Sequence, residues 1–458
     1  MKIINPANDQ LLKELPADDA AAVAAKVARA RAAQPVWAAT PLDERLAAIT
    51  RFRDLLGARK EELALLLTRE MGKPIAQARN ELAAMPGRLD FFLRETASVL
   101  GDDAVYREGD GPTPKLEEII AHEPLGVIAN VSAWNYPYFV GSNVFVPALL
   151  TGNTVLYKPS ELTTLTGLRI VELLHEAGVP IDAIIAVVGD GATGAALVGA
   201  AVDGVFFTGS YATGKRIAAA VAGRMIKVQL ELGGKDPTYV CDDVDVRAAA
   251  ESLADGAMYN AGQSCCSVER LYVHARIAPA FIDAFVATVG GFVVGDPEDP
   301  KTYIGPLARR DQLAVLEAQV ADAIAKGGRV LCGGKRGTRA GTFEPTVIVD
   351  ARNDMRLMRE ESFGPIIGIA TVDGDNEAVR LMNDTEYGLT AGVYAADRAR
   401  AQAILRRIDA GSVYWNCCDR VSPRLPWTGR RHSGMGSTLS THGIRAFLQP
   451  KAWHLRAP

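Results

Sequence analysis

The sequence predicts an α/β fold with two domains. The chain has 458 residues, which exceeds what a single hydrophobic core usually serves. Apolar strands alternate with amphipathic helices between about residues 125 and 232, and again between about residues 235 and 435. Such alternation is typical of βαβ units around a parallel sheet, with ligands at the carboxyl ends of the strands. Two further segments, 114–124 and the last dozen residues, read as extended ribbons that belong to neither core.

The composition excludes several classes of protein. The net charge is −4, from 50 basic and 54 acidic side chains, so we expect neither nucleic acid nor a membrane surface as a partner. The first residues lack the apolar core of a secretory signal, and no apolar run approaches the roughly 20 residues that span a bilayer. Six cysteines in so long a chain do not form a disulfide framework, which favours a cytoplasmic protein. The histidines are scattered, so we expect no metal site.

The N-terminal part is predicted to be helical from residue 17 to residue 100. The alanine-rich stretch 17–34 has apolar residues three and four apart, as on one face of a helix. Thr40 is predicted to cap the next helix, with Pro41 in its first turn. Gly72 is a typical end for the helix after that.

The two alternating regions contain the remaining predicted elements. In the first region we expect buried strands at 153–158, 183–189 and 204–209, with helices at 164–178 and 193–202. In the second we expect helices at 246–262 and 309–328 and a strand at 270–274, and an extended tail at 441–455. An unpaired ribbon promotes aggregation unless it finds a partner. Pairing of the ribbons across subunits would remove that hazard, so we expect an oligomer.

A possible dinucleotide motif occurs at "GDGATG", residues 189–194. It follows a predicted strand and opens a helix, but the acidic residue expected about 20 positions later is missing, and Asp203 comes too early. A tight turn that needs glycine explains the match equally simply. Ser210, at the start of another helix, could instead meet a phosphate. Lys158 and Glu161 lie at the end of a predicted strand, where doubly wound proteins hold the adenosine ribose. A carboxylate there could accept both ribose hydroxyls and would repel a 2′-phosphate, which favours NAD over NADP, although Lys158 could attract that phosphate.

Four stretches of the sequence match motifs that occur together in one protein family. They are "SAWNYPY" (132–138), "LELGGKDP" (230–237), "NAGQSCCSVER" (260–270) and "EESFGPIIGI" (360–369). With these motifs in this order, the chain resembles the aldehyde dehydrogenase superfamily over essentially its whole length. The resemblance implies an aldehyde dehydrogenase-like fold of two domains and an arm. It assigns residues 1–113 and 125–232 to a Rossmann-type dinucleotide-binding domain, 233–436 to an α/β catalytic domain, and 114–124 and 437–458 to a β-ribbon arm for oligomerisation.

The resemblance also implies the catalytic residues. The nucleophile is the residue two places after the glutamine, which makes it Cys265, and Cys266 is then a small neighbour that fills space. A thiolate that attacks an aldehyde creates an oxyanion, which needs donors directed at it. Asn135 suits that role together with the Cys265 backbone N–H. Glu231 is the base that activates water to hydrolyse the thioester.

Activation of the Cys265 thiol calls for a separate explanation. Helix N-termini lower the pKa of a thiol, but the predicted helix 246–262 ends just before Cys265 and presents its opposite end. We therefore expect Glu231, acting through water, and bound oxidised cofactor to favour the thiolate.

Cofactor contacts follow from the same resemblance. It places them at Trp134, Lys158, Glu161, Gly191, Ser210, Glu361 and Phe363, with Glu361 on the nicotinamide ribose and Phe363 beside the ring. The expected cofactor is NAD, with NADP possible. The arm matches those by which family members build a homodimer or a homotetramer.

The sequence restricts the substrate only to a small-molecule aldehyde. Tyr136, Tyr138 and Trp427 are expected to line a tunnel, or to be plain core aromatics. Asn143 stands where some members carry an arginine that binds a far carboxylate. Arg420 and Arg424 could steer an acidic aldehyde, or simply face water.

Other functions stay open at this point. Coenzyme A could accept the acyl group in place of water, although the presence of Glu231 argues against this. A cysteine hydrolase would have no use for Glu161, Ser210 and Glu361. A non-catalytic relative would be free to lose Cys265, Glu231 or Asn135, and all three are present.

Overall fold

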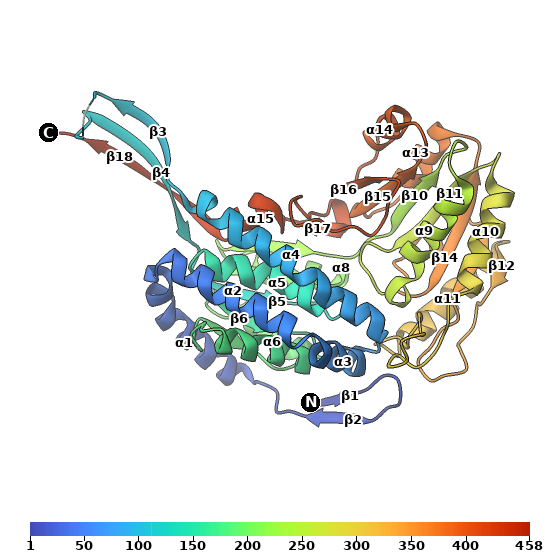
Figure 1. Cartoon of the computed structure of the whole chain (residues 1–458), viewed down its shortest axis with the longest axis horizontal. Helices are drawn as coiled ribbons and strands as arrows, with labels where there is room; N and C mark the ends of the chain where they lie inside the picture. Colours follow the sequence, from blue (N-terminus) through green and yellow to red (C-terminus); the bar gives the residue numbers. More distant parts are fainter. Residues whose placement is uncertain (111) are drawn as a thin grey trace.

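The computed structural model describes residues 1–110 and 112–458. Within them the chain forms two large sheets flanked by helices, an antiparallel arm and an N-terminal hairpin (Figure 1). The predicted α/β class is therefore confirmed. Residue 111, inside the predicted segment 1–113, lies outside the described residues. In the described part, no helix is both long and apolar enough to cross a bilayer.

The N-terminal segment begins with the hairpin of β1 (Lys2–Ile4) and β2 (Leu11–Glu14) and continues as helices. These are α1 (Ala20–Ala39), α2 (Leu42–Ala58), α3 (Lys60–Met71) and α4 (Ile75–Leu100). Gly72 ends α3 as predicted. The predicted cap at Thr40 is wrong, because Thr40 closes α1 by donating its hydroxyl to the Val36 carbonyl, whereas Pro41 precedes α2 without a side-chain bond.

The first large sheet has the strand order β17-β9-β8-β5-β6-β7, parallel except for β17. Its strands are β5 (Val127–Val131), β6 (Thr154–Lys158), β7 (Ile184–Ala186), β8 (Gly204–Thr208), β9 (Lys227–Glu231) and β17 (Gly434–Met435). Alternate strand residues enter different hydrophobic clusters: Ile128 and Phe206 join one, and Val127 and Phe207 the other. Both faces of this sheet are therefore covered, as expected for parallel strands.

Helices from different parts of the chain cover the two faces. The face of Ile128 packs against α2, α4, α5 (Pro137–Leu150) and α6 (Thr164–Glu176). The opposite face packs against α1, α7 (Gly191–Gly199) and α8 (Tyr211–Val221). Helices α7 and α8 begin directly after β7 and β8, so their N-termini lie at the carboxyl edge of the sheet, where ligands of such folds bind.

The second large sheet has the order β12-β13-β14-β11-β10-β15-β16, parallel except for the edge strand β12. Its strands are β10 (Asp236–Val240), β11 (Val268–His274), β12 (Arg329–Cys332), β13 (Thr346–Val349), β14 (Ile366–Val372), β15 (Thr390–Tyr394) and β16 (Ser412–Trp415). The helices of this part are α9 (Val246–Met258), α10 (Ala278–Gly290), α11 (Gln312–Ala325), α12 (Arg356–Arg359), α13 (Asp375–Asn383) and α14 (Arg398–Leu405).

The arm is a small antiparallel sheet in which β4 (Leu116–Pro124) lies between β3 (Asp103–Glu108) and β18 (Leu448–Arg456). It projects from the body at the upper left of Figure 1. The two predicted ribbons therefore pair with each other inside one chain, and β3 was not predicted. Part of the predicted extended tail is the helix α15 (Ser440–Arg445), which packs on α4 and α5.

Candidate active site

Cys265 lies in the turn between α9 and β11, where the chain reverses sharply. Asn260 and Ala261 both have a φ of +55°, and Gly262 has a φ of +69°. A Cβ at Gly262 would lie 2.2 Å from the Gly364 carbonyl, so only glycine fits there. Strained backbone of this kind persists where the surrounding structure holds it, and it is frequent at functional sites. The predicted helix 246–262 is thus too long, because α9 ends at Met258.

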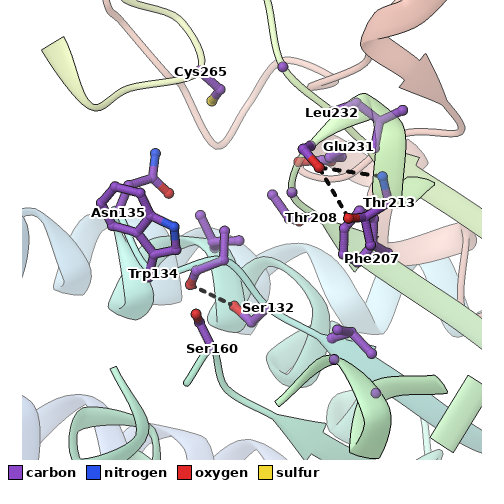
Figure 2. A pocket seen from close by; sticks show the side chains of 18 of the residues that line it. Ser132, Trp134, Asn135, Ser160, Phe207, Thr208, Thr213, Glu231, Leu232 and Cys265 are labelled. Atoms are coloured by element: carbon purple, nitrogen blue, oxygen red, sulfur yellow. Dashed lines mark hydrogen bonds between the residues drawn. The ribbon is translucent and has the colours of Figure 1, made fainter. Parts of the chain in front are cut away.

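Asn135 faces Cys265 from the other sheet, in the loop between β5 and α5. Figure 2 shows the Cys265 sulfur and the Asn135 amide directed into the same space from opposite walls. The Asn135 Nδ2 donates to the Gln263 carbonyl at 3.2 Å, which ties the amide to the cysteine turn. Its own carbonyl accepts from Lys73, whose ammonium also pairs with Glu81 at 2.6 Å in a fully buried salt bridge.

Glu231 ends β9, beside the antiparallel strand β17. Its carboxylate accepts hydrogen bonds from the Thr438 hydroxyl and from the Gln229 amide. Burial raises the pKa of Glu231 to about 7, although both hydrogen bonds and the charge of Arg88 lower it. A carboxyl with that pKa changes its protonation state near neutral pH, as a general base should.

The two glycines after Glu231 permit close packing. A Cβ on Gly233 would lie 2.3 Å from the Glu361 carboxylate, and one on Gly234 would lie 2.7 Å from the Cys265 carbonyl. These glycines therefore let the loop approach two other site segments.

A cavity of about 800 Å³ runs from Cys265 to the N-termini of α7 and α8. All of the predicted catalytic and cofactor residues line it: Trp134, Asn135, Lys158, Glu161, Gly191, Ser210, Glu231, Cys265, Glu361 and Phe363. Its residues come from both large sheets and their loops, so the cavity lies where the two parts of the molecule meet. Clefts between domains are the usual place for a ligand of this size.

The end of the cavity beside the N-termini of α7 and α8 suits the ribose and phosphates of a dinucleotide. Ser210 caps α8 and leaves its N-terminus facing the cavity, where a phosphate would be favoured. Asp190 caps α7 instead, and its carboxylate accepts from the Ala192 N–H at 2.9 Å, a position unfavourable for phosphate. Lys158 is buried, and Glu161 is exposed beside it. The Glu161 carboxylate can accept the hydroxyls of a ribose, and the Lys158 cation and the open N-terminus of α8 suit the negative charge of a pyrophosphate.

The opposite end is formed by the loop at 361–363. Glu361 accepts the Gly234 N–H at 3.1 Å, and burial raises its pKa to about 8. Phe363 has a φ of +46°, and its ring lies edge-on to Trp134 with 5.5 Å between centroids. The buried carboxylate of Glu269 holds this loop by accepting the N–H groups of Ser362 and Phe363.

Glu269 was not predicted to belong to the site. Its carboxylate also pairs with the fully buried Lys235. Glu269 lies in β11, one residue before the strand predicted at 270–274, and an acid directly beside an apolar strand is the signal that could have identified it.

A second cavity of about 710 Å³ opens on the other side of Cys265 and Glu231. Tyr136 and Trp427 line it as expected, but Tyr138 does not. Tyr138 is buried in the core and donates its hydroxyl to the Leu63 carbonyl, so its interpretation as a tunnel residue is wrong. Arg420 and Arg424 are exposed at the rim.

Arg88, on α4, also lines this second cavity, although it was not predicted to belong to the site. The sequence pattern could have predicted that Arg88 is buried. It lies three residues after Met85 and four before Phe92, on the apolar face that α4 buries. An arginine on such a stripe is an exception that calls for a function.

Cys266 lines the second cavity but not the first, which holds the predicted cofactor residues. Its thiol donates to the Asp419 carboxylate at 2.9 Å. The pKa of Cys266 is raised well above its ordinary value by its interaction with Cys265, by burial and by Asp419. A thiol held protonated in this way is a poor nucleophile.

Comparison with known proteins identifies the family of the chain. The profile of the aldehyde dehydrogenase family matches residues 1–453. A succinate-semialdehyde dehydrogenase [NADP(+)] of Deinococcus radiodurans is 36% identical over 98% of this chain and 93% of its own length. A betaine aldehyde dehydrogenase of Cereibacter sphaeroides is also 36% identical, over 98% of this chain and 92% of its own length.

Solved structures are similar as well. The crystal structure of an NAD-dependent aldehyde dehydrogenase from Sinorhizobium meliloti has a TM-score of 0.96 and 33% identity, covering 100% of this chain and 92% of the other. An indole-3-acetaldehyde dehydrogenase complexed with NAD+ has a TM-score of 0.94 and 33% identity, covering 100% and 93%. The chain therefore belongs to the aldehyde dehydrogenase family and is an NAD(P)-dependent oxidoreductase.

Proposed function

We propose that the protein oxidises an aldehyde to the carboxylic acid through a thioester on Cys265. The observation that carries this proposal is the position of Cys265, Asn135 and Glu231, which line one cavity together with every predicted cofactor residue. Cys265 and Glu231 also line the second cavity, through which a substrate could reach the sulfur without displacing the cofactor.

The chain's own groups suit each chemical step. Glu231 accepts the Cys265 thiol proton through water and passes it to solvent. The Cys265 sulfur then bonds to the aldehyde carbon, and the carbonyl electrons move to oxygen, where the Asn135 amide and the Cys265 N–H stabilise the charge. Lys158, Glu161, Ser210 and Glu361 would hold a nicotinamide dinucleotide, which would supply the hydride acceptor for this carbon. Glu231 then takes a proton from water, which attacks the thioester and releases the acid and the thiol.

Water is the proposed acyl acceptor rather than coenzyme A. Support comes from Glu231, a buried carboxylate whose pKa of about 7 fits a base at neutral pH. The test is to follow reduced nicotinamide by absorbance with NAD and a panel of aldehydes, with and without coenzyme A. We expect turnover that does not depend on coenzyme A, and a strict requirement for it would refute this part of the proposal.

We propose NAD as the preferred cofactor. Glu161 lies in the cavity beside the end of β6, where its negative charge would repel the 2′-phosphate of NADP. The neighbouring Lys158, whose pKa is lowered by burial, donates to the Pro159 carbonyl.

We also propose the division into a dinucleotide-binding domain (1–113 and 125–232), a catalytic domain (233–436) and an arm (114–124 and 437–458). Support comes from the sheets, since β5 to β9 share one sheet, β10 to β16 share another, and β4 pairs with β18. Strand β3 belongs with the arm on the same grounds.

Assembly into a homodimer or homotetramer is the final part of the proposal. The arm exposes large apolar side chains on both edge strands, among them Tyr106 on β3 and Trp453 on β18. A projecting sheet with apolar side chains and open edges favours association with another copy. The cysteines are all free, which supports a reducing compartment such as the cytoplasm.

A further inference from the structure

Arg88 is a buried cation that lines the second cavity together with Cys265. It is 5% exposed, and burial lowers its pKa to about 10, so it remains charged at neutral pH. Its guanidinium lies over the Phe139 ring at 4.4 Å, and its Nη1 donates to the Asn143 Oδ1 at 2.6 Å. The Nε has no hydrogen-bond partner within the described residues.

No carboxylate in the described part of the chain forms a salt bridge with Arg88. The acids that line the same cavity have other partners. Glu81 pairs with Lys73, Asp419 accepts the Cys266 thiol, and Asp255 accepts the Tyr303 hydroxyl. Glu231 is held by Thr438 and Gln229. Glu81 and Glu231 act on the Arg88 charge through space, but neither forms a salt bridge with it. Burial of a charge is normally offset by a direct counter-charge, so a guanidinium whose hydrogen-bonded partner is a neutral amide is costly.

We propose that Arg88 binds a carboxylate at the end of the substrate remote from the aldehyde, so that the protein prefers ω-oxo acids to neutral or cationic aldehydes. The proposal rests on the proposed function, because it names the substrate class of that same site. The guanidinium supplies a planar set of donors that matches a carboxylate, and its unpartnered Nε is one of them. Asn143 fixes the orientation of this group by accepting from Nη1.

The positions of Asn135 and Asn143 along α5 are consistent with a substrate that reaches from the Asn135 amide to the Arg88 guanidinium. Asn135 precedes the helix, and Asn143 follows Pro137 by six residues, which is about 9 Å along the axis. A chain of several carbons fits this span. The charge of Arg88 disfavours a quaternary ammonium aldehyde at this wall.

The experiment compares matched substrates. We would measure kcat/KM with saturating NAD for succinate, glutarate and adipate semialdehydes, for the methyl ester of each, and for betaine aldehyde. We expect at least one semialdehyde to exceed its own ester by about 10- to 100-fold, the range for a hydrogen-bonded ion pair. The ester of equal length controls for the effect that Arg88 has on Glu231.

Variants then assign the preference to one residue. Arg88→Met should bring the ratio of acid to ester within about threefold of unity, whereas Arg94→Met, an exposed arginine of the same helix, should leave the ratio unchanged. Should Arg88→Met fail to fold, competitive inhibition of the unaltered enzyme by glutarate against dimethyl glutarate gives a second measurement, and we expect the diacid to bind at least tenfold more tightly.

Three results would overturn the inference. Equal kcat/KM values for every acid and ester would refute it while leaving aldehyde oxidation intact. A preference that survives Arg88→Met but disappears in Arg420→Ala/Arg424→Ala would assign the anion to the rim instead. Absence of reduced nicotinamide with every aldehyde would refute the proposed function itself, and this inference with it.

Discussion

The Cys266 thiol donates a hydrogen bond to the Asp419 carboxylate, whereas its neighbour Cys265 lines both cavities. Both thiols line the second cavity, but of the two only Cys265 also lines the first, so exchanging each in turn separates their roles. Cys265→Ala should lower kcat by at least about 1,000-fold, because no other group can form the thioester. Cys266→Ala should retain kcat within about tenfold. Steady-state kinetics with one aldehyde measures both, and a Cys265→Ala enzyme with normal turnover would remove the sulfur from the mechanism.

The pH dependence of turnover should follow Glu231. Burial raises the pKa of this carboxyl to about 7, so the carboxylate that accepts a proton from water predominates above pH 7 and is lost below it. We expect kcat to rise with pH up to about 7 and then to level off. Glu231→Gln should lower kcat by about 100- to 10,000-fold and abolish that step in the profile. The same step in the variant would show that another group is the base.

Cofactor preference should depend on Glu161. Its charge would repel the 2′-phosphate, so Glu161→Gln should raise kcat/KM for NADP and lower it for NAD, changing their ratio by about tenfold or more. Glu172→Gln, an exposed acid on α6, is the matched control and should change neither value. An unchanged ratio in Glu161→Gln would mean that this carboxylate does not meet the ribose.

Removal of the buried Glu269 charge should damage both stability and cofactor binding. Lys235 would lose its partner inside the protein, which costs about 3–5 kcal/mol of the free energy of unfolding. The loop at 361–363 would lose the acceptor of its N–H groups, so KM for NAD should rise as well. Denaturant unfolding and NAD titration of Glu269→Gln measure the two effects.

Its control is Glu251→Gln, which removes an exposed salt bridge on α9 and should leave the melting temperature unchanged. If Glu269→Gln behaves like this control, the buried pair does not support the loop.

Association should depend on the arm. Trp453 and Leu455 on β18 are 44% and 43% exposed, and they present apolar surface beside an open strand edge. Trp453→Asp/Leu455→Asp should convert the assembly to a monomer of 48.8 kDa, measured by light scattering after size exclusion. Met225→Asp, a fully exposed residue remote from the arm in sequence, should leave the mass unchanged. An unaltered chain that already runs as a monomer would refute the proposed assembly.

Local sequence patterns were enough for several strands: the segments predicted at 153–158, 183–189, 204–209 and 270–274 fall on β6, β7, β8 and β11. These strands are mostly apolar because both of their faces are buried, and such runs can be recognised from the sequence alone. The end of α9 was placed four residues too late, since left-handed backbone at Asn260 and Ala261 leaves no clear signal in side-chain type.

Residues that act through distant partners were much harder to predict. Arg88 and Asn143 are 55 positions apart, and their contact depends on how α4 packs on α5. Asp419 and Cys266 are 153 positions apart. A single sequence without homologues does not indicate which distant residues are in contact, so these residues of the cavity wall could be identified only from the structure.

The bond from the Thr438 hydroxyl to Glu231 joins two residues separated by 207 positions. Ribosomes make the N-terminal part of a chain first, and domains fold as they emerge. Glu231, the proposed general base, therefore lacks its partner until almost the whole polypeptide has been made. A truncated chain could fold the part of the cleft that binds the dinucleotide and still fail to complete turnover. Catalytic activity would therefore arise only late in synthesis and folding.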